Sequence, residues 1–141
     1  MVTLGVADVP AARAFYERLG WTVTFTDGDI VMFQVGGMIL SIWWREQLDA
    51  DGGVVDRGGY GAAALAHAVS DAHAVDARCA EAVAAGATIT RAPGDTPFGY
   101  SGVLADPDGH TWEVAWVRNW ILEADGTVRL PTDDGVAAER P

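Results

Sequence analysis

Short runs of alternating apolar and polar residues recur along the chain, separated by helical patterns and turns. Residues 2–6 alternate in this way, which predicts a strand. Asp8 gives a helix-start signal, and Gly20 marks the end of the helix that follows. Further strands are expected over residues 21–26, 30–35 and 38–44. The first third of the chain therefore predicts the order strand, helix, strand, strand, strand.

The same order returns in the second half of the chain. Residues 65–69 alternate, Asp71 opens a helix and Gly86 closes it, and strands are expected over 87–91, 102–105 and 111–116. Similar segments recur at offsets of 63, 66 and 72 residues. A repeat in fixed order with small insertions indicates two copies of one supersecondary unit. The sequence thus predicts an α+β fold of two tandem βαβββ modules.

The predicted modules cover about residues 1–45 and 62–118, which together make a single domain over 1–118. A Gly- and Asp-rich segment, residues 45–61, is expected to join them as an exposed linker. Residues 119–141 form a C-terminal extension with a hairpin expected around Asp125-Gly126 and a frayed end from about residue 132.

Composition restricts the classes of function. The 141 residues carry a formal net charge of −11, which repels phosphate backbones and makes nucleic acid an unsuitable partner. No apolar run is long enough to span a membrane, and no secretory signal is recognisable at the N-terminus. The single cysteine, Cys79, cannot form an internal disulfide, so a cytoplasmic location is expected.

Several motifs carry a family resemblance. Val-x-Asp stands at residues 6–8 and again at 69–71, Phe15-Tyr16 lies in the first helix, and Asp106-Pro-Asp-Gly-His110 precedes Glu113. Together with the repeat, these motifs resemble the vicinal oxygen chelate superfamily of glyoxalases, bleomycin-resistance proteins and extradiol dioxygenases. The resemblance covers roughly residues 1–118 and implies a curved mixed sheet around a cleft, and a homodimer.

The resemblance also implies four positions for metal ligands. Two lie five residues before the Val of each Val-x-Asp, at Met1 and Ala64, and two lie on the last strands, at Ser41 and Glu113. Only Glu113 is a ligand for a divalent ion, whereas a catalytic site normally needs three protein ligands. We therefore expect no resident metal and no cofactor. His67 is three residues after Ala64, so strand alternation predicts that it lies on the opposite face, partly buried beneath the second helix.

The same alternation predicts a small-molecule site whose walls are mainly small or apolar. The residues expected to line it are Thr3, Ile39, Ser41, Trp43, Ala64, Ala66, Thr111 and Glu113, with Phe98 and Tyr100 reaching its mouth from loops. Trp43 is the candidate for stacking on a planar ligand. Glu113 is expected to be a lone carboxylate in an apolar cleft, with a raised pKa, where it anchors a ligand or acts as a general acid or base.

These observations favour a metal-free small-molecule-binding protein, similar to those that sequester an antibiotic or metabolite of aromatic or amphipathic character. The alternative is a glyoxalase-like lyase or isomerase, or a dioxygenase, with an atypical metal site or with acid–base catalysis by Glu113. A third interpretation is a non-catalytic partner subunit that associates through surface tryptophans such as Trp116 and Trp120.

Overall fold

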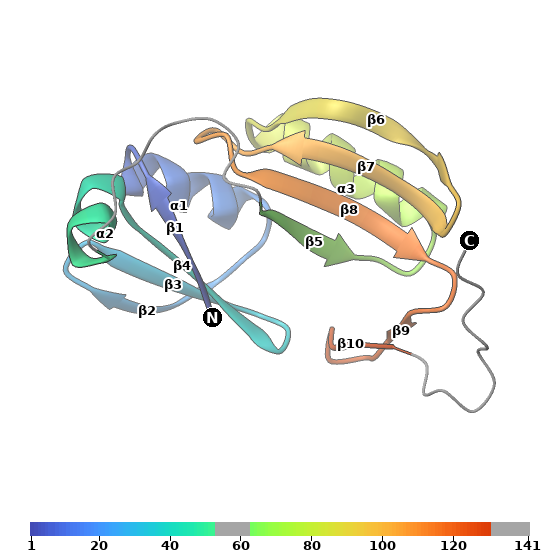
Figure 1. Ribbon diagram of the computed structural model, residues 1–141, viewed down its shortest axis with the longest axis horizontal. Coiled ribbons are helices and arrows are strands. Elements are labelled where there is room, and N and C mark those ends of the chain that lie inside the picture. The colour runs from blue at the N-terminus through green and yellow to red at the C-terminus, as the bar shows by residue number, and fades with distance from the viewer. Residues whose placement is uncertain (53–62, 131–141) are drawn as a thin grey trace.

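The computed structural model describes residues 1–52 and 63–130, in which two modules lie side by side (Figure 1). The first module contains β1 (Val2–Val6), α1 (Val9–Arg18), β2 (Val23–Asp27), β3 (Ile30–Val35) and β4 (Met38–Trp44). α2 (Arg45–Gly52) follows it. The second module contains β5 (Ala64–Ala68), α3 (Ala72–Ala85), β6 (Thr88–Thr96), β7 (Gly99–Ala105) and β8 (Thr111–Val117). Two short strands, β9 (Ile121–Leu122) and β10 (Val128–Arg129), come last.

Each module has its own four-stranded mixed sheet, with strand orders β1-β4-β3-β2 and β5-β8-β7-β6. The first strand lies at an edge and pairs in parallel with the last, and the other pairs are antiparallel. Gly5 pairs with Trp43, and Ala68 pairs with Ala115. These pairs are related by the offsets of 63 and 72 residues seen in the sequence. The predicted α+β fold of two βαβββ modules is confirmed.

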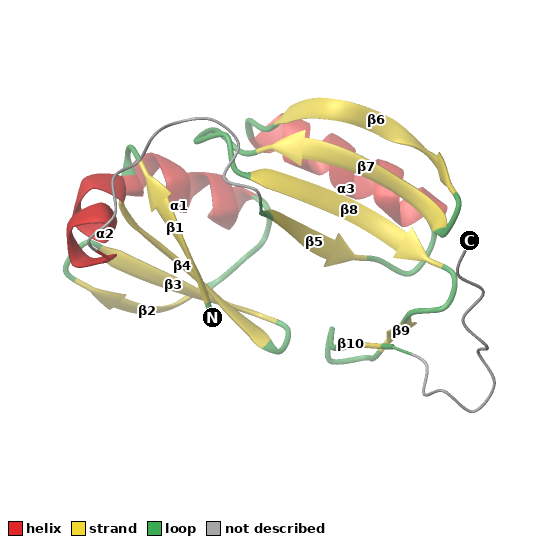
Figure 2. Ribbon diagram, viewed as in Figure 1, coloured by secondary structure: helices red, strands yellow, loops and turns green. Residues whose placement is uncertain are grey.

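The two long helices begin at the aspartates that the sequence predicted. The Asp8 side chain accepts a hydrogen bond from the Ala11 N–H at 2.9 Å, and Asp71 accepts one from the Ala74 N–H at 2.8 Å. These bonds satisfy amide groups that would otherwise have no partner in the first turn. Gly86 ends α3 in the left-handed conformation, with φ 119°. Both helices cover one face of their own sheet (Figure 2).

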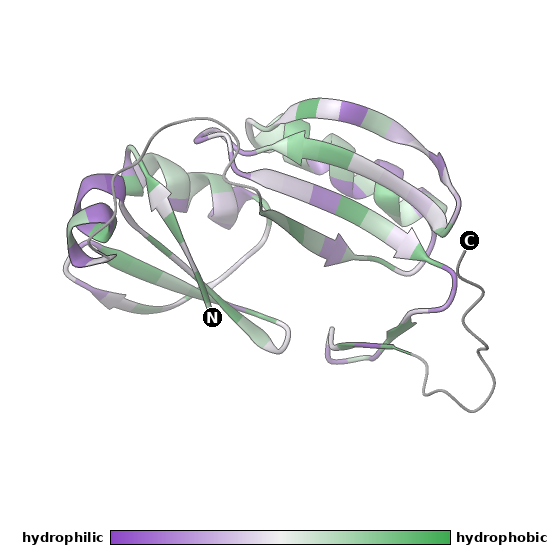
Figure 3. Cartoon of the chain, viewed as in Figure 1, coloured by the Kyte–Doolittle hydropathy of each residue, from purple (hydrophilic) through white to green (hydrophobic). Residues whose placement is uncertain are grey.

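An aromatic cluster joins the cores of the two modules. Tyr16 of α1 stacks on Trp21 at a centroid distance of 5.1 Å, and Trp21 meets Trp112 of β8 edge-on at 5.5 Å. Tyr16 is almost fully buried and Trp112 largely so. In Figure 3, β3 and β4 are mostly hydrophobic, whereas hydrophilic segments interrupt hydrophobic ones along β6 and β8, as in a sheet with one face on a core. The modules therefore share one hydrophobic core.

The segment predicted to be an exposed linker begins with a helix. α2 packs closely on the face of β1 that carries Gly5. A Cβ atom added to Gly5 would lie 3.2 Å from the Arg45 Cα and 3.3 Å from the Leu48 Cδ2. A side chain at position 5 would thus displace α2. The rest of the predicted linker, residues 53–61, lies outside the described residues.

The expected hairpin at the C-terminus is present. β9 and β10 are antiparallel, and their turn is closed by Asp125, whose side chain accepts a hydrogen bond from the Thr127 N–H at 2.9 Å. Gly126 supplies a positive φ of 82° in this turn. The predicted frayed end from residue 132 lies outside the described residues. Within residues 1–52 and 63–130, no helix is long and apolar enough to cross a membrane.

Candidate functional site

Glu113 lies in the middle of β8, on the face of the second sheet that points away from α3. Its neighbours in the strand, Trp112 and Val114, are buried on the opposite face. Ala66 of β5 and Val103 of β7 are its partners on either side. The Glu113 side chain is 41% exposed, so a ligand can reach its carboxylate.

Arg91 of β6 lies beside Glu113 on this face. One guanidinium nitrogen is 3.4 Å from the Glu113 Oε1 and donates a 2.7 Å hydrogen bond to the Ser101 Oγ. The other terminal nitrogen donates to the Ser101 carbonyl at 3.0 Å. These two hydrogen bonds hold the Arg91 side chain against the sheet at Ser101, which is only 3% exposed. The expectation that Glu113 is a lone carboxylate in an apolar cleft is therefore wrong: it has a cationic neighbour.

The other predicted residues of the second module share the face of Glu113. Ala64 pairs with Thr111, two residues before the pair of Ala66 with Glu113. Ala64 and Ala66 are exposed, and Thr111 is half-buried. Their small side chains leave the Arg91–Glu113 pair open along β5.

The predicted residues of the first module lie on a different sheet. Thr3 pairs with Ser41, which is only 2% exposed, and Ile39 is exposed two residues earlier on β4. Trp43 is half-buried, and its indole N–H donates a 2.7 Å hydrogen bond to the Gln47 Oε1 of α2. The structure thus places the predicted residues in two groups, one on each module.

The two aromatic residues expected at the mouth of the site differ in position. Phe98 lies in the turn between β6 and β7 and is 73% exposed. Tyr100 lies within β7 rather than in a loop, and its hydroxyl donates a 3.1 Å hydrogen bond to Asp76 of α3. This bond raises the Tyr100 pKa, because it stabilises the protonated phenol. Tyr100 therefore points to the helix-covered face, away from Glu113.

The four family positions for metal ligands do not fit a divalent ion. Met1, Ser41 and Ala64 offer no strong ligand for such an ion, and Glu113 is beside a guanidinium. In the described ranges, no group of three His, Cys, Asp or Glu side chains is placed to hold a metal. The donor set at this site supports hydrogen bonding and charge pairing rather than Lewis-acid chemistry.

A large hollow of about 800 Å³ lies between the modules. We call it the inter-module hollow, and its lining includes Trp21, Gln34, Gly36, Met38, Ala66, His67, Ala68, Ser70, Arg78, Trp112, Glu123 and Gly126. Ala66 is the predicted site residue that also lines this hollow. His67 is partly buried, as expected, and its pKa is lowered by burial and by the nearby Arg78. The imidazole is therefore neutral at physiological pH.

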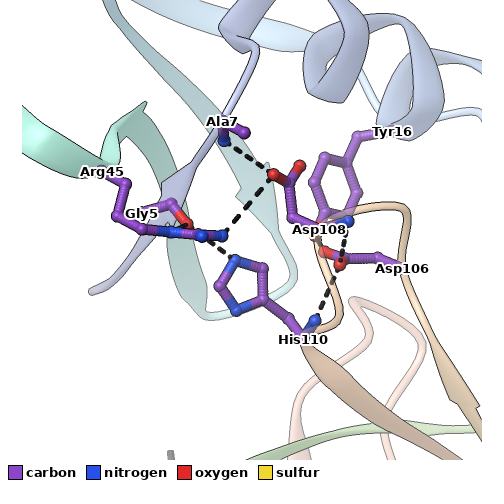
Figure 4. A network of polar contacts seen from close by, with 7 residues as sticks. All are labelled: Gly5, Ala7, Tyr16, Arg45, Asp106, Asp108 and His110. Atoms are coloured by element: carbon purple, nitrogen blue, oxygen red, sulfur yellow. Dashed lines mark hydrogen bonds and ion pairs between the residues drawn. The ribbon is translucent and has the colours of Figure 1, made fainter. Parts of the chain in front are cut away.

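The Asp106-to-His110 motif forms a contact between the modules (Figure 4). The Asp108 Oδ1 accepts a 2.7 Å hydrogen bond from the Ala7 N–H and lies 3.7 Å from the Arg45 guanidinium. The His110 Nε2 is 3.0 Å from the Gly5 carbonyl oxygen. Within the turn itself, the backbone N–H of His110 donates to the Asp106 Oδ1 at 2.8 Å. The motif thus binds the edge of β1.

Family comparison agrees with this architecture. The model of the Glyoxalase/Bleomycin resistance protein/Dioxygenase superfamily matches residues 1–114. The chain belongs to this superfamily. The predicted resemblance is confirmed, and the match spans both βαβββ modules of this superfamily member.

Solved structures of related proteins support the assignment. A glyoxalase-related enzyme from Fulvimarina pelagi is 37% identical, with a TM-score of 0.84 over 92% of this chain and 94% of that one. A superfamily enzyme from Burkholderia phytofirmans is 25% identical, with a TM-score of 0.73 over 82% and 95%. Lactoylglutathione lyase from Agrobacterium tumefaciens is also 25% identical, with a TM-score of 0.63 over 82% and 90%. A comparison with curated protein sequences gave no match.

Proposed function

We propose that this superfamily member binds a small organic molecule without a resident metal ion, and that Arg91 and Glu113 are its polar anchors. The observation that carries this proposal is the Arg91 guanidinium 3.4 Å from Glu113, at the ligand position that the family pattern retains. A fixed cation beside a carboxylate offers both donors and acceptors to a ligand. Because the pair is half-exposed, part of its hydrogen-bonding capacity is available.

Trp43 supplies the aromatic part of the wall of the site, and Thr3 and Ile39 lie on the same face of the first sheet. Ser41 shares this face but is only 2% exposed, so it supports the wall rather than contacting the ligand. These residues lie on the first sheet, whereas Arg91 and Glu113 lie on the second. A homodimer would complete the site if the first module of one copy faced the second module of its partner. Gln47 already fixes the Trp43 indole, which reduces the entropy lost when a planar ligand stacks on it.

The ligand class that fits these residues is aromatic or amphipathic with at least one polar group. Sequestration of an antibiotic or a metabolite needs only binding, and the superfamily's description includes bleomycin resistance. A cytoplasmic location stays a prediction, supported by the single, buried Cys79.

Calorimetric titration of ligands found in a screen of aromatic antibiotics and metabolites tests this proposal. Arg91→Ala and Trp43→Ala are each expected to weaken binding by roughly tenfold or more, as the loss of a charged hydrogen bond or of a stacked ring does. Arg13→Ala removes an exposed arginine of α1 and serves as the control. Unchanged affinity in both site variants would show that the ligand binds elsewhere. Light scattering on the same samples tests the dimer.

The second candidate function is catalysis, as a glyoxalase-like lyase or isomerase or as a dioxygenase. It is favoured by the accessible Glu113 carboxylate and by the likeness to a protein named lactoylglutathione lyase. With Glu113 as general acid or base, Glu113→Gln would abolish turnover and leave ligand affinity nearly intact. If Glu113 only anchors a ligand, the same variant weakens binding and there is no turnover to lose.

A further inference from the structure

The internal repeat relates two places where a turn of one module faces the first strand of the other. In the first, the β7–β8 turn binds the edge of β1: His110 contacts the Gly5 carbonyl, and Asp108 accepts from the Ala7 N–H. Gly5 and Ala7 point these backbone groups away from β4, toward the open edge of the sheet. The contact thus resembles the addition of one strand residue.

The second place contains the repeat counterparts of these residues. Ala68 corresponds to Gly5, as the pairing of β5 with β8 confirms, and Ser70 corresponds to Ala7 at the same offset of 63 residues. Met38 corresponds to His110, and the β3–β4 turn is Gly36-Gly37, which has no side chain to replace Asp108. A thioether cannot donate a hydrogen bond. The residues that fill the first place are therefore missing from the second.

The backbone of β5 leaves a donor and an acceptor at this second place. The Val69 N–H donates to the Ala115 carbonyl of β8 at 2.9 Å. Because alternate residues of a strand point their amide groups to opposite sides, the Ala68 carbonyl points to the open edge. Ser70 follows β5, and its N–H is expected to point the same way because its repeat counterpart, the Ala7 N–H, does so. Ala68, Ser70, Gly36 and Met38 all line the inter-module hollow.

The residues that line the hollow and its volume limit the kinds of ligand that fit it. Trp21 and Trp112 form an aromatic wall of the hollow, and the β9–β10 hairpin forms a second wall without aromatic residues. This hairpin reaches the first module, since a Cβ atom on Gly36 would lie 3.1 Å from the Gly126 carbonyl oxygen. A volume of about 800 Å³ is in the range of small-molecule sites.

The charges at the hollow are already paired within the chain. Arg78 lies 2.6 Å from Glu81, and Glu123 lies 3.3 Å from Arg129. The neighbouring His67 is neutral at physiological pH. An uncharged ligand therefore suits this hollow better than an ionised one.

We propose that the inter-module hollow binds an uncharged ligand with an aminoacyl unit, such as a blocked amino acid or a short peptide. The amide N–H of the unit donates to the Ala68 carbonyl, and its carbonyl accepts from the Ser70 N–H, as a residue of an added parallel strand would. An apolar side chain on the unit packs against Trp21 and Trp112. This site adjoins the face of the Arg91–Glu113 pair at Ala66, but neither Arg91 nor Glu113 lines it.

Calorimetry on the full chain with N-acetyl-L-phenylalaninamide tests the proposal. The probe is expected to bind once per chain. The analogue methylated on the phenylalanine nitrogen lacks the donor, and its affinity is expected to be lower by a factor of roughly five or more. In Met38→His the new imidazole is expected to contact the Ala68 carbonyl, as His110 contacts the Gly5 carbonyl. It would then compete with the probe and weaken its binding by a similar factor. Met38→Leu keeps an apolar side chain of similar size and is the matched control.

Backbone amide shifts in an NMR titration locate the probe. A shift of the Ser70 amide that saturates with the calorimetric curve supports the site. The proposal is overturned if the probe does not bind at millimolar concentration, if the methylated analogue binds equally well, or if the shifts fall on Glu113 and its neighbours instead. It is also overturned if a second copy of the chain occupies the β5 edge and excludes the probe.

Discussion

The Tyr16 hydroxyl donates a 2.6 Å hydrogen bond to the Asp106 Oδ2 between two buried residues that are 90 positions apart. The other carboxylate oxygen of Asp106 accepts from the backbone N–H groups of Asp108 and His110. One carboxylate thus shapes the β7–β8 turn and ties it to α1. This geometry places Asp108 and His110 on the edge of β1.

Tyr16→Phe is expected to lower the free energy of unfolding by about 1–3 kcal/mol, because it leaves a buried carboxylate oxygen without its donor. Urea denaturation at neutral pH measures this loss. Tyr100→Phe is the matched control, since its hydroxyl also donates to a carboxylate but at an exposed site. An equal loss in the two variants would show that burial of the Tyr16–Asp106 pair has no energetic consequence.

The stability of the wild-type chain is expected to fall in alkaline solution. Burial, and next the charge of Asp106, raise the Tyr16 pKa far above its ordinary value of 10.0. Above about pH 10 the unfolded chain loses the phenol proton while the folded chain keeps it, so unfolding becomes more favourable. Denaturation curves at pH 8 and pH 10.5 should show a smaller decline for Tyr16→Phe than for the wild type. The same decline in both would assign it to other groups.

His67 is expected to lower the stability of the folded chain in acid solution. Its pKa is lowered, first by burial and then by Arg78, so protonation favours the unfolded chain. Its contribution to stability is therefore present above about pH 6.5 and is lost as the pH falls through the lowered pKa. His67→Leu should flatten the decline between pH 7.5 and pH 5 in urea denaturation. His73→Gln, at an exposed site on α3, should leave it unchanged.

Gly102 of β7 packs directly under the thiol of Cys79. A Cβ atom at position 102 would lie 2.9 Å from the Cys79 Sγ and 3.0 Å from the Pro93 Cγ. Gly102→Ala is therefore expected to cost about 1–3 kcal/mol of unfolding free energy through overpacking. The double variant with Cys79→Ala makes room for the added methyl group and should recover part of that loss relative to Cys79→Ala alone. Strict additivity of the two changes in thermal denaturation would contradict the contact.

Much of the fold could be predicted because the repeat fixes both the order and the pairing of the elements. The pairing of Gly5 with Trp43 determines that of Ala68 with Ala115 once the offsets are known. Helix starts followed from Asp8 and Asp71, whose side chains cap the helices as their positions indicate. Because successive residues of a strand point to opposite faces, strand alternation predicts that His67 and Glu113 lie on opposite faces of the second sheet.

The rest depended on irregular structure and on tertiary contacts. The register of β6 against β7 shifts between Ile89 and Arg91 and again before Gly94, so simple alternation could not place Arg91 beside Glu113. Tyr100 is expected in a loop because the predicted strand begins only at Gly102, whereas β7 begins at Gly99. α2 has few apolar residues and packs on β1 through Leu48 above Gly5, a contact that only the tertiary structure reveals.

Arg91 and Glu113 are proposed to hold ligands without a resident metal ion. Elemental analysis of the purified, untagged chain after dialysis against nickel, zinc, manganese and iron(II) tests this proposal most directly. Much less than one metal ion per chain is expected, with no change in Glu113→Gln. About one metal ion per chain in the wild type, lost in Glu113→Gln, would contradict the account and make a metal-dependent enzyme the better description.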